Sequence, residues 1–480
     1  MARREAAGRK GKGEAMDNTV NNTTGDRIED MIQKARTALR AFEPFTQEEV
    51  DDCVKAMCLA FKESTVELAE LAVAETGFGD LNAKIAKNSG SPDGVWFELK
   101  GKKSVGVIGE DAALKLKYVA KPKGVLASVA PVTNPNVTVI FNAAYAIKGR
   151  NSIIVAPHPR AKKSAARTCE ILRAALVKAG APADLIQCVE EPTIDLTQRL
   201  MRSCDVILAT GGTGMVQAAY ASGRPAFGVG PGNVQTIFDR EYSDYRKAVG
   251  QTVVGRQFDN GLVCACNQSF IIPTEMEESL AALMTEEKAV VIDDEKQVDR
   301  FRKFLFPDGA QINPDVVGRN IQDIAKMMGF EIPEDAVIVV LKVDKKNAGD
   351  KDPLCGEKMC PVAICVTYDT FEEAVDIARK NLLYQGAGHS AVIHTDDAAK
   401  AEYCGVELPV SRLMVNQPGI FAANPALANG FRPTSTLGCG SWGNNSISEN
   451  LTFEHLINVS RIGWMKDESE IPSPEQIWAD

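Results

Sequence analysis

Apolar residues in the first hundred positions recur with the spacing of amphipathic helices. From Asp26 onward they repeat every three to four residues, and the first set is Ile28, Met31, Ile32, Ala35, Leu39 and Phe42. Thr46 and Glu49 have the spacing of a capping box, which predicts the start of a second helix. The pattern stays helical to about Gly101, so we expect a helical region at the start of the fold.

After Lys123 the pattern changes to short apolar runs that alternate with amphipathic segments. The first runs are Gly124–Ala130, Ser152–Ala156, Leu185–Val189, Val206–Ala209 and Pro225–Val229. The second series is Ser269–Ile272, Ala289–Ile292, Ala336–Leu341, Val362–Tyr368, Ala391–His394 and Leu413–Val415. Continuous apolar strands that alternate with helices are typical of parallel sheets covered on both faces. We therefore predict an α/β fold with two doubly wound parallel-sheet domains.

The break between the two series falls near Gly255–Asn260 and sets the predicted domain boundaries. The expected divisions are 1–25, 26–255, 256–436 and 437–480. The first is polar and aperiodic, which predicts a disordered leader. The last is rich in Gly and Ser and then apolar at Leu451–Ile462, which favours a strand or arm that packs on a partner subunit.

Composition excludes several classes of protein. The chain has 480 residues with 54 Lys and Arg against 64 Asp and Glu, and this charge of −10 argues against a broad nucleic-acid-binding surface. No apolar stretch approaches the ~18 residues of a membrane helix. Twelve scattered cysteines favour free thiols in a reducing cytoplasm, and four dispersed histidines argue against a zinc site. We expect a cytoplasmic protein with no metal, nucleic-acid or membrane partner.

The segment Phe258–Gln268 places Cys264 just after an Asn-Gly turn, at the joint between the two series. Ligands of open α/β proteins bind at such joints, and a thiolate there is a good covalent nucleophile. The alternative is a buried structural cysteine, which is the commonest state of a free thiol.

Thr210, Gly211, Gly212 and Thr213 follow a predicted strand and open a helix. Glycines let backbone N–H groups approach a phosphate, and the helix N-terminus adds a favourable dipole. The segment lacks the G-x-G-x-x-G pattern, so an ordinary strand-to-helix turn is the alternative.

The strand at Ile153–Val155 runs into a basic turn that contains His158, Pro159 and Arg160. An acidic residue at this place favours NAD through the ribose hydroxyls, whereas a basic turn suits the 2′-phosphate of NADP. A solvated surface turn is the alternative.

Two further polar residues stand where a side chain can act. Asn134 precedes Pro135 at the end of the first strand, and an amide held there can donate to a developing oxyanion; an Asn-Pro turn is the alternative. Arg412 lies inside an apolar run and needs a partner, either a protein carboxylate or a substrate anion.

Seven segments together resemble the CoA-acylating members of the aldehyde dehydrogenase superfamily. They are Thr133–Pro135, Pro157–Pro159, Ala209–Gly212, Gly228–Asn233, Phe258–Gln268, Gly388–Ser390 and Leu437–Ser446. Their order and spacing match over nearly all of the chain after residue 26. The resemblance implies a nucleotide-binding domain over 26–255 and a catalytic domain over 256–436. It also implies a small oligomerisation flap near 105–122 with the arm of 437–480, and a homodimer or homotetramer.

The resemblance also implies roles for individual residues. Cys264, rather than Cys266, corresponds to the nucleophile, and Asn134 corresponds to the oxyanion amide. Glu357 corresponds to the acidic residue near the nicotinamide ribose, and His389 to a histidine close to the active cysteine. The remaining contacts are Thr133, His158, Pro159, Arg160, Thr210, Gly211, Gly212, Thr213 and Gly230 for the cofactor, and Arg412, Ala265 and Ser411 for the substrate.

One absence points to the acyl acceptor. Hydrolytic members of the superfamily carry a Glu base upstream of the cysteine, and the matching stretch, Arg224–Phe238, has no carboxylate. Water without a general base attacks a thioester slowly, whereas the thiol of coenzyme A is far more nucleophilic. We therefore expect an aldehyde, CoA and NADP (or NAD) to give acyl-CoA and reduced cofactor through a thioacyl-enzyme on Cys264.

The resemblance is strongest to the acylating succinate-semialdehyde dehydrogenases, over Val410–Pro418 and Ser435–Gly463. The implied reaction is succinate semialdehyde to succinyl-CoA, with Arg412 on the distal carboxylate. Ala265 and Pro418–Pro425 depart from that subgroup, so sulfoacetaldehyde and then acetaldehyde or propionaldehyde remain alternatives. The non-enzyme alternative is an inactive scaffold or microcompartment cargo, against which the intact Cys264 and Asn134 count.

Overall fold

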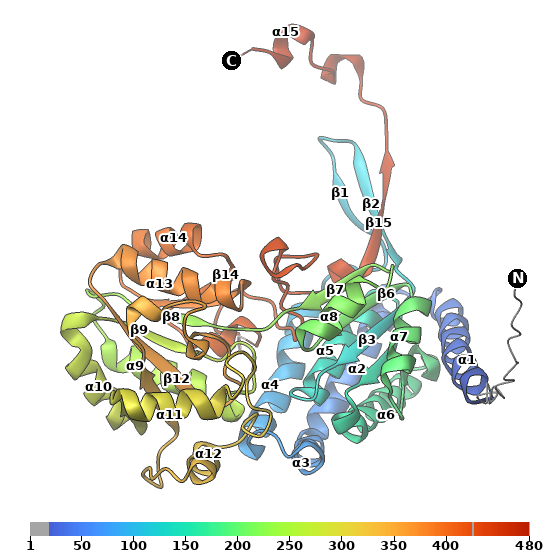
Figure 1. The fold of residues 1–480 in the computed structure, drawn as a ribbon. Coiled ribbons are helices and arrows are strands. Elements are labelled where there is room, and N and C mark those ends of the chain that lie inside the picture. Colours follow the sequence, from blue (N-terminus) through green and yellow to red (C-terminus); the bar gives the residue numbers. More distant parts are fainter. Residues whose placement is uncertain (1–18, 425–426, 480) are drawn as a thin grey trace, which may run out of the picture.

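The computed structural model describes residues 19–424 and 427–479, and it contains two parallel sheets and a projecting antiparallel sheet (Figure 1). The predicted α/β class with two parallel sheets is confirmed. Among the described residues, none of the helices combines the length and apolar character needed to cross a membrane.

The chain begins with four helices that support the first sheet. They are α1 (Thr19–Phe42), α2 (Gln47–Glu63), α3 (Thr65–Thr76) and α4 (Leu81–Leu99). The predicted capping box is present, because the Glu49 N–H donates to Thr46 Oγ1 (3.3 Å) and the Thr46 N–H donates to Glu49 Oε2 (2.8 Å). Helix α1 starts at Thr19, inside the predicted disordered leader, since extending a formed helix costs little per residue. Residues 1–18 of that leader lie outside the described residues.

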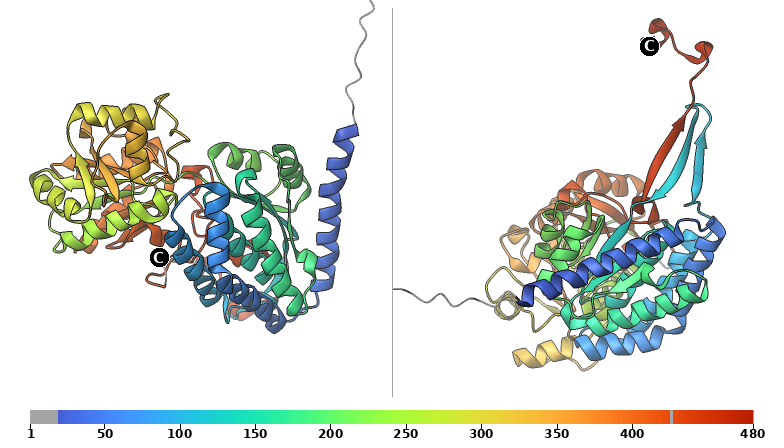
Figure 2. Two further views of the ribbon diagram at one scale, coloured as in Figure 1. Left: turned by 90° about the horizontal axis from the view of Figure 1, so that it is seen from below. Right: turned by 90° about the vertical axis from the view of Figure 1, so that its right-hand side faces the viewer.

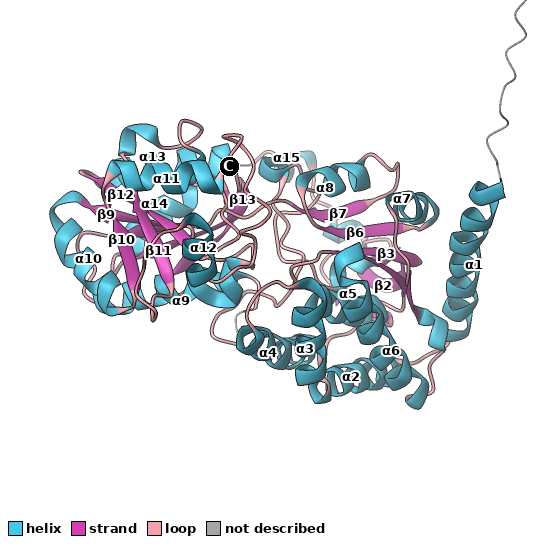
Figure 3. Cartoon of the chain, turned by 60° about the horizontal axis from the view of Figure 1, so that its bottom comes forward, coloured by secondary structure: helices cyan, strands magenta, loops and turns pink. Residues whose placement is uncertain are grey.

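The first sheet has five parallel strands in the order β5-β4-β3-β6-β7. They are β3 (Val125–Ala130), β4 (Ser152–Pro157), β5 (Ile186–Cys188), β6 (Val206–Thr210) and β7 (Ala226–Val229). Helices α5 (Pro135–Lys148) and α6 (Lys162–Lys178) pack on one face, and α1, α7 (Ile194–Ser203) and α8 (Thr213–Tyr220) on the other (Figure 3). The strand order reverses between β3 and β6, and ligands bind beyond the carboxyl ends at such a switch point.

The second sheet has seven parallel strands in the order β10-β11-β12-β9-β8-β13-β14. They are β8 (Gln235–Phe238), β9 (Ser269–Pro273), β10 (Ala289–Ile292), β11 (Ile338–Lys342), β12 (Val362–Tyr368), β13 (Gly388–His394) and β14 (Val410–Val415). Helices α9 (Tyr245–Gln257) and α10 (Glu277–Glu286) share one apolar core with this sheet. The other core contains α11 (Glu295–Leu305), α12 (Ile321–Met328), α13 (Phe371–Tyr384) and α14 (Ala398–Glu407).

Strand β8 corrects the predicted domain boundary. It pairs with β13 and β9, so the chain enters the second sheet between Val229 and Gln235 rather than near residue 255. Strand β8 starts with the polar residues Gln235 and Thr236, so it lacks the continuous apolar run that marks the other short strands. The break seen near Gly255–Asn260 is the end of α9.

The projecting sheet is built from segments far apart in the sequence. Strands β1 (Gly106–Asp111), β2 (Leu116–Pro122) and β15 (Ile457–Gly463) are antiparallel in the order β1-β2-β15. This sheet extends away from both parallel-sheet units, and the short helix α15 (Pro474–Ile477) lies beyond its tip (Figure 2). These strands lie within the ranges 105–122 and 437–480 that the resemblance implies for the flap, and its role in oligomerisation stays a prediction.

Candidate active site

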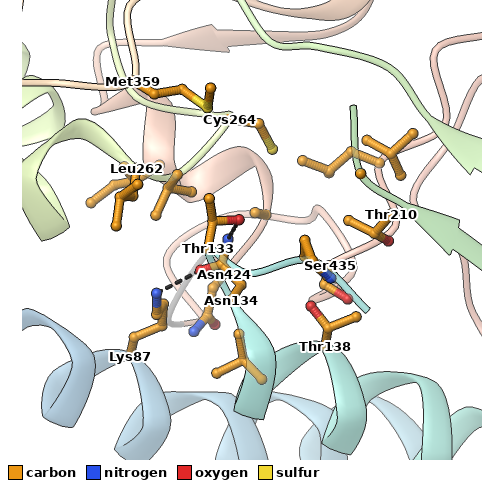
Figure 4. Close-up of a pocket in the computed structure, with 18 of the residues that line it drawn as sticks. Lys87, Thr133, Asn134, Thr138, Thr210, Leu262, Cys264, Met359, Asn424 and Ser435 are labelled. Atoms are coloured by element: carbon orange, nitrogen blue, oxygen red, sulfur yellow. Dashed lines mark hydrogen bonds between the residues drawn. The ribbon is translucent and has the colours of Figure 1, made fainter. Parts of the chain in front are cut away.

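A cavity of about 600 Å³ lies where the carboxyl ends of the first sheet meet the loop that leads into β9. Its walls come from α4, the ends of β3 and β6, the loop with Cys264, and residues within 420–424 and 434–437. Figure 4 shows Cys264 on one side of this cavity and Thr133 and Asn134 on the other. Residues distant in the sequence are therefore brought to one site.

The fully buried Arg256 fixes the backbone of the loop that carries Cys264. The Arg256 guanidinium donates to the carbonyl oxygens of Asn267 (3.1 Å), Gly261 (3.0 Å) and Lys358 (2.6 Å). On the other side, a Cβ at Gly232 would lie 1.9 Å from the Cys264 carbonyl oxygen, so only glycine permits this approach. The cysteine therefore sits on a tightly fixed backbone.

Cys264 and Cys266 differ in their surroundings. Cys264 is partly exposed and lines the cavity, whereas Cys266 is fully buried and its thiol lies 3.7 Å from the Phe258 carbonyl oxygen. Burial, followed by the nearby Glu357 carboxylate, raises the pKa of Cys264 well above its ordinary value. The resting group is a neutral thiol, so a nucleophilic role requires a proton acceptor nearby.

Asn134 stands at the N-cap of α5, but its side chain does not cap that helix. Its Oδ1 accepts a hydrogen bond from Lys87 Nζ (2.5 Å), and its Nδ2 donates to Thr133 Oγ1 (3.2 Å). Pro135 at the first helical position lacks an N–H, which leaves one donor fewer to satisfy. Asn134 lines the cavity, and its Nδ2 carries two N–H groups, so one of them remains for an oxyanion after the hydrogen bond to Thr133.

The turn after β6 has the properties of a phosphate cradle. Thr210, Gly211, Gly212 and Thr213 line the cavity, and a Cβ at Gly212 would meet no atom within 4 Å. The Thr210 hydroxyl is buried without a hydrogen-bond partner, which leaves a donor for a ligand. Gly230 also lines the cavity. These residues fit the pyrophosphate of a nicotinamide cofactor at the switch point between β3 and β6.

The basic turn after β4 is only partly turned to the cavity. His158 lines it, whereas Pro159 and Arg160 do not. Arg160 donates to the Thr76 carbonyl oxygen (3.0 Å) and stacks on Phe78 at 4.5 Å. Its role toward a 2′-phosphate stays a prediction.

Among the described residues that line the cavity, Glu357 is the sole aspartate or glutamate. Its Oε1 accepts a hydrogen bond from the Gly232 N–H (3.2 Å), the same glycine that abuts Cys264. Burial raises the pKa of Glu357 to about 7. The lack of a carboxylate in Arg224–Phe238 thus does not leave the cavity without one, because the fold brings Glu357 in from a distant segment.

Comparison with known proteins agrees with this geometry. The model of the aldehyde dehydrogenase family matches residues 12–311. The chain is 51% identical to succinate-semialdehyde dehydrogenase (acetylating) of Clostridium kluyveri, over 94% of this chain and 98% of the relative. The chain belongs to the aldehyde dehydrogenase family.

Two further similarities extend the match to other members of the family. A sulfoacetaldehyde dehydrogenase of an Acholeplasma species is 38% identical over 94% of this chain and 93% of the relative. An acetylating aldehyde dehydrogenase from Geobacillus thermoglucosidasius superposes with a TM-score of 0.90 at 35% identity, over 95% of this chain and 99% of that structure. The predicted resemblance to the acylating aldehyde dehydrogenases is confirmed.

Several predicted site residues of this aldehyde dehydrogenase lie behind the cavity wall. Arg412, on β14, is 2% exposed and does not line the cavity. It donates to the carbonyl oxygens of His389 (2.7 Å) and Gly438 (2.9 Å), to Ser390 Oγ (3.2 Å) and to Asn450 Oδ1 (3.2 Å). The expected partner, a protein carboxylate or a substrate anion, is thus replaced by neutral oxygens of the fold.

His389, Ser411 and Ala265 also lie outside the residues that line the cavity. The His389 Nδ1 contacts Ser390 Oγ (3.1 Å), while its Nε2 is buried without a partner. Burial, followed by the charge of Arg412, lowers the pKa of His389 to about 3, so the imidazole is neutral at physiological pH. Ser411 and Arg412 are neighbours on β14, so their side chains point to opposite faces of the sheet. Neither of them lines the cavity.

Sequence reasoning missed two residues of the site. Lys87 lines the cavity from α4, and Arg256 supports the cysteine loop from α9. Each is a cation on a helix, and helical cations are usually solvated. One sequence signal for Lys87 was available. Lys84 and Lys87 are three residues apart near the start of a helix, so they lie on the same helix face.

Proposed function

We propose that this protein catalyses the CoA-acylating oxidation of succinate semialdehyde to succinyl-CoA, with NADP or NAD as oxidant. The observation that carries the proposal is the juxtaposition, in one cavity, of the Cys264 thiol, the Asn134 amide and the cradle of Thr210–Thr213. The similarity to the Clostridium kluyveri enzyme supports the choice of substrate and of acyl acceptor.

In the proposed reaction, Cys264 is the nucleophile and Asn134 stabilises the oxyanion. The Cys264 sulfur forms a bond to the aldehyde carbon, and the carbonyl electron pair moves to oxygen. Asn134 Nδ2 and the Cys264 N–H donate to that oxyanion. Thr210–Thr213 would hold the nicotinamide cofactor, which would supply the acceptor for the hydride of the same carbon. The carbonyl then re-forms as a thioester on Cys264, and the sulfur of CoA displaces the enzyme sulfur.

Glu357 is the proposed acceptor of the Cys264 proton. Only its carboxylate form can accept a proton, so the single-turnover rate of cofactor reduction will rise with pH through about 7, up to roughly tenfold per unit on the acidic side. Burial, followed by the charge of Arg160, lowers the pKa of His158, which also lines the cavity, whereas the pKa of Glu357 is raised. Stopped-flow absorbance of reduced cofactor from pH 5.5 to 8.5 measures the profile.

The matched variant is Glu357→Gln, which keeps the shape and the hydrogen bond from Gly232 but cannot take up a proton. In Glu357→Gln the rise of the single-turnover rate near pH 7 will be absent. If the rate of Glu357→Gln still rose with pH near 7, the titration would belong to another group and Glu357 would not be the proton acceptor.

The distal carboxylate of the substrate needs donors other than Arg412. The hydroxyls of Thr138 and Ser435 are buried without hydrogen-bond partners, and both residues line the cavity drawn in Figure 4. Hydroxyl donors of this kind suit a carboxylate. They suit a sulfonate as well, and the 38% identical sulfoacetaldehyde dehydrogenase makes sulfoacetaldehyde the second candidate.

A cofactor-reduction assay tests the proposal. We expect turnover with succinate semialdehyde that depends on CoA and exceeds turnover with sulfoacetaldehyde, propionaldehyde and acetaldehyde. Equal rates with and without CoA would refute acyl transfer to CoA. A preference for sulfoacetaldehyde would replace the substrate, and turnover with none of the four aldehydes would favour the inactive scaffold. Running the assay with NADP and NAD separately measures the cofactor preference.

We also propose a homodimer or homotetramer in the cytoplasm. The flap and the chain beyond it expose large apolar side chains, among them Trp464 (52% exposed), Met465 (87%) and Trp478 (85%). An apolar surface of this kind marks a protein interface. The twelve cysteines are free thiols, as a reducing compartment requires.

A further inference from the structure

Helix α4 carries two lysines that meet a buried aspartate beside the cavity. Lys84 and Lys87 lie one turn apart, and both ammonium groups contact Asp259 Oδ2, at 3.1 and 2.7 Å. The Asp259 side chain is fully buried, and its Oδ1 accepts a hydrogen bond from the Asp80 N–H (3.0 Å). Two cations and one anion leave this cluster with a net positive charge. The mechanism described so far does not use it.

Lys87 is the member of the cluster that reaches the site. Its Nζ donates to Asn134 Oδ1 at 2.5 Å, a hydrogen bond drawn in Figure 4. The Lys84 ammonium donates instead to Asp259 and to the Thr133 carbonyl oxygen (3.4 Å). Among the described residues that line the cavity, Lys87 is the sole lysine or arginine. The same ammonium is held at 2.7 Å by Asp259, so its position is fixed by a buried anion.

This contact decides which way the Asn134 amide faces. An ammonium has donors only, so it selects the amide oxygen and leaves Nδ2 on the opposite side. An N-cap asparagine ordinarily uses its oxygen to accept from the first turn of its own helix, and at Asn134 that bond is absent. Lys87 thus competes successfully for the oxygen that the helix would otherwise engage. A cation on the amide oxygen also polarises the amide and strengthens its N–H donors.

We propose that Lys87 is a positioning residue for thioester formation: its ammonium, held by Asp259, aims Asn134 Nδ2 at the oxyanion. The inference rests on the proposed function. As the Cys264 sulfur bonds to the aldehyde carbon, the π electron pair moves to oxygen, and this oxygen gains the hydrogen bond from Nδ2. The charge returns to the carbon–oxygen bond when the hydride departs to the nicotinamide. In this role Lys87 acts through Asn134 and forms no bond with the reacting carbon or with the sulfur.

The structure offers a matched control in the other lysine. Lys84→Met and Lys87→Met each remove one ammonium from the same buried aspartate, so both will lower the thermal stability. Only Lys87→Met also releases Asn134. We expect Lys87→Met to slow single-turnover cofactor reduction by roughly tenfold to a hundredfold, because small misplacements of a catalytic group have effects of that size. Lys84→Met will stay within about threefold of the wild type, since it leaves the Asn134 contact intact.

A double variant tests whether Lys87 acts through Asn134. In an Asn134→Ala background the amide is gone, so adding Lys87→Met will change the rate by less than about threefold. The KM values for aldehyde and cofactor will change little in Lys87→Met, because the interaction develops in the transition state. Should Lys87→Met fail to fold, Lys87→Gln replaces it, since it removes the ammonium that holds Asn134 and keeps a polar side chain beside Asp259.

The outcomes separate this inference from the proposed function. If the wild-type protein, given succinate semialdehyde and oxidised cofactor, forms no thioacyl adduct, the proposed function is wrong. If the wild type forms the adduct and Lys87→Met forms it equally fast, the positioning role is wrong. The role is also overturned if Lys84→Met loses as much activity as Lys87→Met, or if the effects of Lys87→Met and Asn134→Ala multiply.

Discussion

Cys264→Ala will abolish aldehyde oxidation, with turnover at least ~10⁴-fold below the wild type, because removal of a covalent nucleophile eliminates the route rather than weakening it. The thiol lines the cavity on a loop fixed by Arg256 and Gly232, so its loss cannot be made good by a neighbouring group. Cofactor reduction measured by absorbance gives the rate. Intact-protein mass spectrometry after incubation with aldehyde and oxidised cofactor, without CoA, gives the adduct.

Cys266→Ala is the matched control for this substitution. Cys266 stands two residues away, is fully buried and does not line the cavity. Its replacement will keep the adduct and will change turnover by less than about threefold, since small buried side chains away from a site affect stability more than chemistry. An adduct that persists in Cys264→Ala and disappears in Cys266→Ala would transfer the nucleophile to Cys266.

The sequence predicted the parts of this protein that depend on local patterns. Cys264, Asn134 and the Thr210–Thr213 turn each follow or precede a strand that its continuous apolar run makes recognisable, and all three line the cavity. Parallel sheets gather their carboxyl ends on one edge, so the residues at those ends meet whatever the exact register. The two-sheet fold was predictable for the same reason.

The features that the sequence did not predict depend on which residues the tertiary fold buries and what they then contact. The strand pattern required a partner for the charge of Arg412, and the family resemblance made that partner the substrate carboxylate. The partners are carbonyl oxygens that no sequence pattern identifies. Strand β8 was missed because its first two residues, Gln235 and Thr236, are polar, which interrupts the continuous apolar run of a buried strand. Lys87 resembled a solvated lysine, and only the fold shows that Asp259, far along the chain, buries it beside Asn134.

The substitution with the second-largest expected effect is Asn134→Ala, which will slow thioester formation by about 10²–10³-fold, the usual result of removing one oxyanion donor. Asn134 is held between Lys87 at its oxygen and Thr133 at its nitrogen, so the donor is already oriented before the aldehyde binds. A preorganised donor of this kind needs no rearrangement when charge develops on the oxygen. The single-turnover rate of cofactor reduction is the measurement, because it isolates the acylation half of the reaction from transfer to CoA.

Two variants distinguish loss of the donor from damage to the fold. Asn134→Asp has the same shape and can still accept from Lys87, but it presents an acceptor to the oxyanion, so it will lose at least as much activity as alanine. Asn136→Ala removes a buried asparagine in the same helix turn, one that donates to Thr168 Oγ1 (3.0 Å), and it will lower stability while the acylation rate stays within about threefold. If Asn134→Asp kept more than about a tenth of the wild-type rate, the oxyanion would be held by backbone N–H groups alone. Asn134 would then serve to shape the start of α5, and the amide that Lys87 orients would have no part in the chemistry.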